Sequence, residues 1–232
     1  MKCCNRAQRK PETLCASINK TDHPTNRKTQ TMNFEFAEQI NSDLENLDFI
    51  KALATAESEL EKIPMTDFHS ILRLSLTHQA DSMTTWIDNF YKSTSKRIDI
   101  KALYFEINEF DINTETWYVD GFAFSEDGGL DLDDMEWLCD VTQETMTSEE
   151  FVLKGYEKLQ KAFADIEEQV ENDELTDEVQ NARDWAEQIV IIRFMELMRS
   201  AHLNAKQKNL AWAKIPVYFT EHSYDFIIKS DN

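Results

Sequence analysis

The stretch from Asp177 to Ala205 has the pattern of a helix whose polar face is narrow. Val179, Ala182, Ala186 and Ile189 recur at steps of three and four residues, which is the period of a helix that buries one side. From Ile189 to Met198 nearly every position is apolar. A helix that is apolar almost all round is a buried one, so we expect this segment to lie at the centre of the fold.

Two amphipathic helices are predicted before the first strands. Ser42 and Glu45 have the spacing of a capping box, and apolar residues then recur at helical steps as far as Ile63, before Pro64. Thr66 caps a second apolar pattern that continues to Phe90. We expect the two helices to pack as a hairpin. With only four glycines and four prolines, the chain is poorly suited to an all-β fold with many tight turns.

A period of two begins after residue 100. Residues 103–107 alternate in polarity, which predicts a strand. Residues 117–124 are apolar on both faces, as in a central strand, and Gly121 would allow a neighbour to approach this strand closely. Alternation from Met135 to Val141 predicts a third strand, which gives an antiparallel three-stranded meander within 101–144. The β-branched and aromatic residues of 214–229 predict one or two closing strands near 215–229.

A further helix is predicted between the meander and the buried helix. Thr147 and Glu150 have capping-box spacing, apolar residues repeat from Val152 to Val170, and a turn is expected near Asn172. The chain would then have two long C-terminal helices. The sequence therefore predicts a single α+β domain over residues 32–232.

The first 31 residues differ from the rest. They carry seven Lys or Arg against two acids and show no hydrophobic periodicity, so we interpret them as a disordered basic tail or as an upstream extension before a start at Met32. They also hold three of the four cysteines, and Cys139 alone lies in the body. Without a disulfide framework inside the body, a secretory apolar segment or a membrane-spanning run, a cytoplasmic location is predicted.

The charge of the body restricts its partners. The whole chain has a formal net charge of −20, and residues 32–232 carry 17 basic and 42 acidic side chains, a net charge of −25. Nucleic acid and anionic membranes would be repelled, whereas a basic protein would be attracted. The alternative is that the acidity serves solubility alone.

Motifs for common catalytic chemistries are absent from the sequence. The four glycines leave no GxGxxG, GxxxxGK[ST] or GxSxG motif, and neither HExxH nor Glu-x-x-His occurs. We therefore predict no cofactor and no metal, and a protein that is not an enzyme is favoured. Cys139 has no nearby histidine and is expected to be a packed thiol.

The segment from Phe124 to Asp140 is the densest acidic stretch near glycines. A calcium loop that started at Asp127 would have Gly129 and Leu132 at positions three and six, so the pattern fails. On the predicted strand, Glu136, Asp140 and Glu144 would lie about 13 Å apart along one face, too far to share a proton. We interpret the segment as a connector followed by a strand with an acidic face.

These features favour a non-enzymatic interaction module, such as an inhibitor or immunity-type protein, that binds a basic partner. The expected binding residues are the acids of this segment and an exposed aromatic anchor, namely Asp127, Asp131, Asp133, Asp134, Glu136, Asp140, Glu144 and Trp212. The alternatives are a metal- or carboxylate-dependent hydrolase that combines Asp131, Asp133 or Glu136 with His222, and a soluble domain of another role. The oligomeric state is left open.

Overall fold

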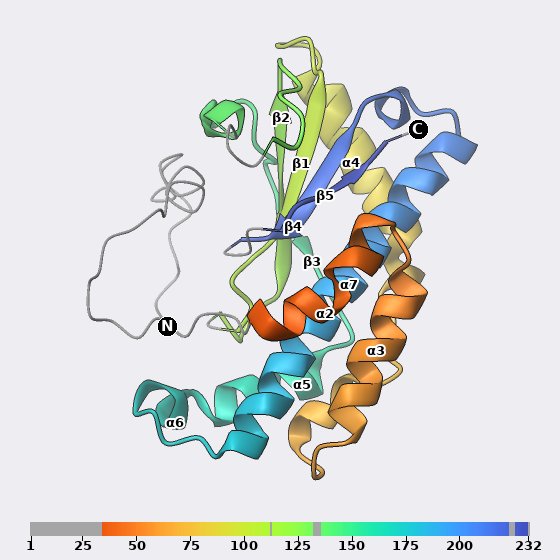
Figure 1. The fold of residues 1–232 in the computed structure, drawn as a ribbon. Coiled ribbons are helices and arrows are strands. Elements are labelled where there is room, and N and C mark those ends of the chain that lie inside the picture. Colours follow the sequence, from red (N-terminus) through yellow and green to blue (C-terminus); the bar gives the residue numbers. More distant parts are fainter. Residues whose placement is uncertain (1–33, 112, 132–135, 223–225, 232) are drawn as a thin grey trace.

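Helices and a five-stranded sheet make up the computed structural model, which describes residues 34–111, 113–131, 136–222 and 226–231 (Figure 1). The fold is α+β, as predicted. The elements in chain order are α2 (Phe34–Glu45), α3 (Phe49–Glu61), the 3-10 helices η2 (Asp67–Ile71) and η3 (Thr77–Gln79), α4 (Ala80–Thr94), β1 (Ala102–Ile107), β2 (Tyr118–Phe124), the 3-10 helix η4 (Glu136–Cys139), β3 (Phe151–Val152), α5 (Glu157–Asp165), α6 (Glu167–Glu171), α7 (Asp177–Gln207), the 3-10 helix η5 (Ala211–Lys214), β4 (Val217–Glu221) and β5 (Ile228–Ser230).

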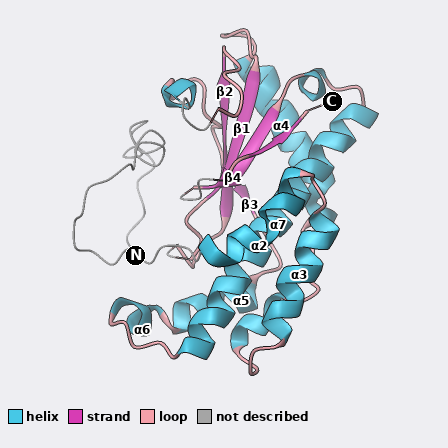
Figure 2. Ribbon diagram, viewed as in Figure 1, coloured by secondary structure: helices cyan, strands magenta, loops and turns pink. Residues whose placement is uncertain are grey.

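The sheet is mixed, with the strand order β3-β2-β1-β4-β5. β1 pairs with β2 in antiparallel orientation and with β4 in parallel orientation, while β3 and β5 add antiparallel edges. The long helices gather on one side of the sheet (Figure 2). A parallel partner requires a crossover, and here the helices α5, α6 and α7 lie between β2 and β4 in the chain.

The central helix of the fold is α7, as the sequence predicts. The Thr176 hydroxyl oxygen caps it by accepting the Val179 N–H, and the helix then continues for 31 residues. It packs against α3, α4 and β4, so it is covered from several directions. Ile189, Ile192 and Met198 have no exposed surface. The helix face of the sheet supplies the other side of this core through residues such as Phe105 and Phe219.

The predicted third strand is wrong. Its described residues form η4 and a loop, and Trp137 packs edge-on against Phe124 and Tyr218, with ring centroids 5.0 and 5.2 Å apart. The edge of β2 is instead hydrogen-bonded by residues 145–153. The Ala123 N–H donates to the Thr145 carbonyl, and β3 pairs with the start of β2. Because that edge is occupied, residues 136–143 fold over the second face of the sheet.

The expectation of two long C-terminal helices is also wrong, because only α7 is long among the described residues. The Thr147 hydroxyl does not cap a helix but accepts the Gly121 N–H. The helix that follows starts only at Glu157, and it is interrupted at Ile166, whose φ of −109° separates α5 from α6. The predicted turn near Asn172 is present, and Asp173 has a left-handed φ of 58°.

The N-terminal hairpin differs from the prediction in its boundaries and packing. Ser42 lies inside α2, and α3 begins at Phe49 after an Asp48 cap that accepts the Lys51 N–H. The segment after Thr66 is divided into η2, η3 and α4. α3 and α4 both pack against α7, which supplies the apolar surface that each needs.

Two finer expectations are confirmed. The closing strands are present as β4 and β5, which pair with each other. At Gly121, an added Cβ would lie 2.5 Å from the Phe105 ring and 2.9 Å from the Thr147 methyl group, so only glycine fits at this close approach.

Two further expectations concern the tail and the membrane. The predicted tail, residues 1–31, lies outside the described residues. Within the described ranges, every helix is too short or too polar to cross a bilayer.

A buried histidine joins α7 to the closing strands. His202 has no exposed surface and stacks on Trp212, with an angle of 18° between the rings. Its Nδ1 lies 2.6 Å from the Ser230 hydroxyl, and its Nε2 lies 3.3 Å from the Ala213 carbonyl, which suits a neutral ring that donates from Nε2. Burial, followed by Lys206 and Arg199, lowers the pKa of His202 to about 4.

We expect His202 to make stability depend on pH. Folding lowers the pKa of His202. Below about pH 6.5 the ring binds a proton in the unfolded chain, whereas in the folded chain it stays neutral down to about pH 4. The neutral, buried His202 therefore adds up to about 3 kcal/mol to the free energy of unfolding above pH 6.5. This stability is lost as the pH falls from about 6.5 to about 4. Denaturant unfolding at a series of pH values should show that the free energy of unfolding falls less with decreasing pH in His202→Gln than in the unsubstituted chain. The exposed control His78→Gln should keep the original slope, and an unchanged slope in His202→Gln would refute the assignment.

Candidate functional site

The acids predicted to bind a partner lie in the segment that covers the second face of the sheet. All the described members are exposed, namely Asp127, Asp131, Glu136, Asp140 and Glu144. Asp127 differs, because it accepts a hydrogen bond from the Tyr218 hydroxyl and lies 4.0 Å from the Lys229 ammonium. Asp127 therefore anchors this segment to the sheet. Asp133 and Asp134 lie outside the described residues.

The expectation that Trp212 is exposed is wrong. It has no exposed surface, because it lies in η5 and stacks on His202 under the C-terminal end of α7. Trp117 is equally buried, and Trp137, on η4, is half-buried. None of these three residues is presented as a free aromatic anchor.

Cys139, at the end of η4, also departs from expectation. It is disulfide-bonded and half-buried, which is not the packed thiol that the sequence predicts. A cytoplasmic location, which relied in part on unpaired cysteines, stays a prediction.

A second acidic concentration is fully presented on the surface. It comprises the eight carboxylates between residues 165 and 178, a range without any basic side chain, and all eight are exposed. We call this surface the acidic corner, and its members are Asp165, Glu167, Glu168, Glu171, Asp173, Glu174, Asp177 and Glu178. It covers the end of α5, all of α6 and the start of α7, at the end of the molecule far from η4 (Figure 1).

Helix stability explains only part of the acidic corner. Glu167 and Glu168 lie in the first turn of α6, and Asp177 and Glu178 in that of α7, where acids are favourable. α6 has only five residues, and adjacent like charges on such a short helix destabilise it. Asp173 adopts a left-handed φ of 58°, a conformation that Asp tolerates better than most residues. One ion pair, from Lys161 to Asp165, lies at its edge. Local structure therefore offsets only part of the repulsion among these eight charges.

A buried polar row crosses the centre of the sheet on the face opposite the long helices. Glu106 of β1 lies directly opposite Asp120 of β2 and, on its other side, beside Thr220 of β4. The exposed fractions of the three side chains are 6%, 7% and 1%. His222 follows β4 by one residue, and its N–H donates to the Ile107 carbonyl, which continues the ladder and leaves the imidazole on the Glu106 face. We call Glu106, Asp120, Thr220 and His222 the sheet-face cluster.

Glu106 and His222 form the acid–base pair of this cluster. The Glu106 Oε1 lies 2.9 Å from the His222 Nδ1, while the Glu106 Oε2 is buried without a hydrogen-bond partner. The neighbouring phenol of Tyr104 responds to this environment: burial first, and then the Glu106 charge, raise the pKa of Tyr104 well above its usual range. A carboxylate that holds an imidazole in place is a recurrent arrangement in catalysis and in cation binding.

The combination of His222 with Asp131, Asp133 or Glu136 stays a prediction, and Asp133 lies outside the described residues. His222 pairs with Glu106, a residue that the sequence analysis did not select. A search of the described residues finds no group of three potential ligands arranged to hold a metal ion. Glu106 and Asp120 could have been noticed as single acids inside otherwise mainly apolar strands, ALYFEI and YVDGFAF, because a buried acid needs a partner.

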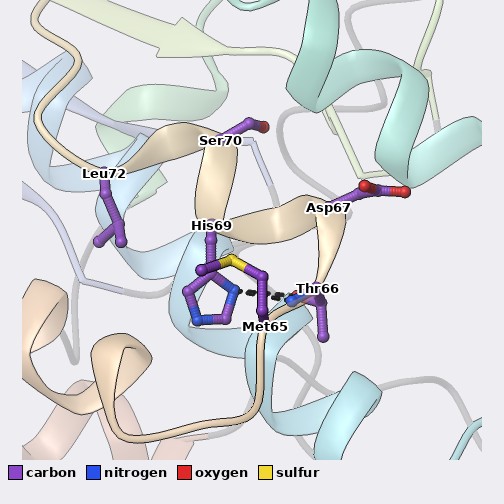
Figure 3. A pocket seen from close by; sticks show the side chains of 6 residues that line it. All are labelled: Met65, Thr66, Asp67, His69, Ser70 and Leu72. Atoms are coloured by element: carbon purple, nitrogen blue, oxygen red, sulfur yellow. Dashed lines mark hydrogen bonds between the residues drawn. The ribbon is translucent and has the colours of Figure 1, made fainter.

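A shallow pocket beside η2 is lined by Met65, Thr66, Asp67, His69, Ser70 and Leu72 (Figure 3). The His69 ring turns toward Thr66 and accepts its N–H at 3.1 Å, so its Nδ1 is used in capping η2. Asp67 is the only carboxylate among these lining residues. The pocket therefore has a local structural role and lacks convergent acid–base groups.

A second buried charge cluster lies on α7. The Arg183 guanidinium lies 3.0 Å from Asp111 and 2.8 Å from Glu187, and both Arg183 and Glu187 are almost fully buried. Burial raises the pKa of Glu187 well above its usual range, and Arg183 opposes this shift. One arginine is shared by two acids, and these pairs connect α7 to the segment that contains Asp111.

Arg183→Met should destabilise the chain by about 3–5 kcal/mol, because it leaves the buried Glu187 and the half-buried Asp111 without their cation. Arg183→Met combined with Glu187→Leu should recover part of that loss. The matched control Arg73→Met, at an ion pair with an 84% exposed side chain, should change stability by less than about 0.5 kcal/mol. Urea unfolding measures all three, and equal effects at the two arginines would contradict the analysis.

Comparison with protein-family models, with curated proteins and with solved structures finds no match to this chain. The function is therefore inferred from the charges, contacts and buried groups described above.

Proposed function

We propose that this chain is a non-enzymatic interaction module that binds a basic protein partner, in the manner of an inhibitor or immunity-type protein. The observation that carries the proposal is the acidic corner, with eight exposed carboxylates and no cation between residues 165 and 178. Complementary charge raises the association rate and selects the partner. The exposed acids around η4 are a second, separate surface that could extend the contact.

The acidic corner fits a protein better than a nucleic acid or membrane. Its potential is negative, and the net charge of the whole chain is −20, so phosphate groups would be repelled. Carboxylates bind lysine and arginine side chains through charge-assisted hydrogen bonds. Because the buried tryptophans are not available, the apolar part of such a contact would have to come from the partner or from residues at the rim.

We expect the full chain to capture a basic protein from the cytosol of its native cell at about 0.1 M salt and to release it at about 1 M, where the Debye length is ~3 Å. Neutralising four acids of the corner, by Glu167→Gln, Glu168→Gln, Glu171→Gln and Glu174→Gln, should reduce capture about tenfold. Quantitative mass spectrometry of the captured proteins measures both effects.

The control removes four exposed acids elsewhere, by Glu45→Gln, Glu61→Gln, Asp81→Asn and Asp99→Asn, and therefore has the same net charge as the corner variant. Its capture should be close to that of the unsubstituted chain. A captured partner that is acidic or indifferent to salt would contradict the proposal, as would equal losses in the two variants.

A carboxylate-dependent hydrolase is the second candidate, and the Glu106–His222 pair is the observation that favours it. If the module proposal holds, a thermal-shift panel with calcium, magnesium, manganese and zinc should leave the melting temperature unchanged. Stabilisation by one of these metals that disappears in Glu106→Gln would favour the hydrolase, because a ligand that binds only the folded state raises its stability.

A further inference from the structure

β3 lies at one of the two edges of the sheet, and its main-chain groups alternate in direction. The Leu153 N–H donates to the Trp117 carbonyl, which continues the ladder with β2. In an antiparallel pair, alternate residues direct both main-chain groups toward the same neighbour, so those of Val152 and Lys154 point away from β2. We call this side of residues 152–154 the outer edge. A sheet edge of this kind is a template on which another strand can pair.

The Gln79 side chain binds the outer edge at Lys154 in the way that a strand would. Its Oε1 accepts the Lys154 N–H at 3.2 Å, and its Nε2 donates to the Lys154 carbonyl at 3.1 Å. A carboxamide has the same donor and acceptor groups as a peptide bond, so this one side chain completes both hydrogen bonds of a ladder pair. Gln79 is 7% exposed, and it directly precedes α4.

Trp86 of α4 holds Gln79 in this position. Its indole N–H donates to the Glu149 carbonyl at 3.0 Å, and its ring centroid lies 5.7 Å from that of Phe151 on β3. Since α4 also packs against α7, the start of α4 is fixed beside the outer edge. The Val152 side chain is nevertheless 42% exposed, so this part of the edge reaches solvent.

The outer edge is complementary to itself, which favours a second copy of the chain as its partner. If two copies pair antiparallel about Val152, each Glu150 lies opposite the Lys154 of the other copy, and the two Val152 side chains are neighbours. Opposite charges and β-branched side chains across a strand pair are both stabilising. The main chain of Glu150 in the second copy would take the place at Lys154 that the Gln79 carboxamide holds. Pairing of two edges and the Gln79 contact therefore exclude each other.

We propose that the outer edge of β3 is a self-association surface for a second copy of this chain, and that the Gln79 side chain opposes this association by occupying it. A carboxamide of the same chain competes well with an incoming strand, because its binding does not cost the translational and rotational freedom of a second molecule. Self-association through β3 is therefore weak while Gln79 binds Lys154, and it becomes stronger when this contact is lost. The acidic corner takes no part in this surface, so the proposed function is tested separately.

Gln79→Met tests the proposal, because it removes both hydrogen bonds and keeps a side chain of similar length. Sedimentation equilibrium of the full chain should give a dissociation constant for self-association at least about tenfold lower in this variant than in the unsubstituted chain, since a second copy then supplies the lost hydrogen bonds. The control Gln207→Met makes the same change at an exposed position at the end of α7. It should self-associate as the unsubstituted chain does.

Hydrogen exchange and a second substitution locate the contact. In Gln79→Met, the amides of Val152 and Lys154 should exchange more slowly as the protein concentration rises. Adding Val152→Lys should return the dissociation constant to that of the unsubstituted chain, because it places like charges opposite each other at the centre of the paired edges. Thermal melts check that each variant folds, and Gln79→Ala replaces Gln79→Met throughout if the latter does not.

Three results would overturn the proposal. The first is equal self-association of the Gln79 and Gln207 variants. The second is a double variant that associates as tightly as the Gln79 variant alone, and the third is concentration-dependent protection that does not include residues 152–154. Tighter association that requires Val152 and protects these amides supports it.

Discussion

The burial of α7 is the constraint on which the rest of the structure depends. The helix is 31 residues long, and most of its length is covered by α3, α4 and the sheet. Every polar side chain on its covered faces must therefore find a partner inside the protein. Arg183 faces Glu187 and Asp111, and His202 stays neutral between Ser230 and Ala213. The same helix supplies the apolar surface against which the sheet and the short helices pack.

The two faces of the sheet carry different side chains, because side chains alternate between the faces along each strand. One face gives Phe105 and Phe219 to the large core around α7. The other gives Tyr104 and Tyr218 to a smaller apolar cluster under η4 and gives Glu106 to the polar row. A shift of one residue in the register would exchange these sets, so the apolar contacts of the core hold the two acids opposite each other.

Local periodicity was sufficient to predict α7, β1, β2 and the closing strands, since each has its own clear pattern. It failed for residues 136–143, whose alternation also fits a 3-10 helix that lies on the sheet while residues 145–153 pair with β2. Pairings between distant segments have no local signal. The parallel contact of β1 with β4, which brings His222 to Glu106, is one such pairing, and the burial of Trp212 under α7 is another.

The acidic corner could be predicted as a cluster of charge, but only the structure shows that its members are all exposed and lie far from η4. The most direct test of its role is nuclear magnetic resonance of the isotopically labelled full chain during titration with a lysine-rich peptide. If the corner is a binding surface for basic proteins, the amides of residues 165–178 will shift first and saturate together. Shifts spread evenly over exposed acids throughout the chain, or absent from residues 165–178, would contradict the account.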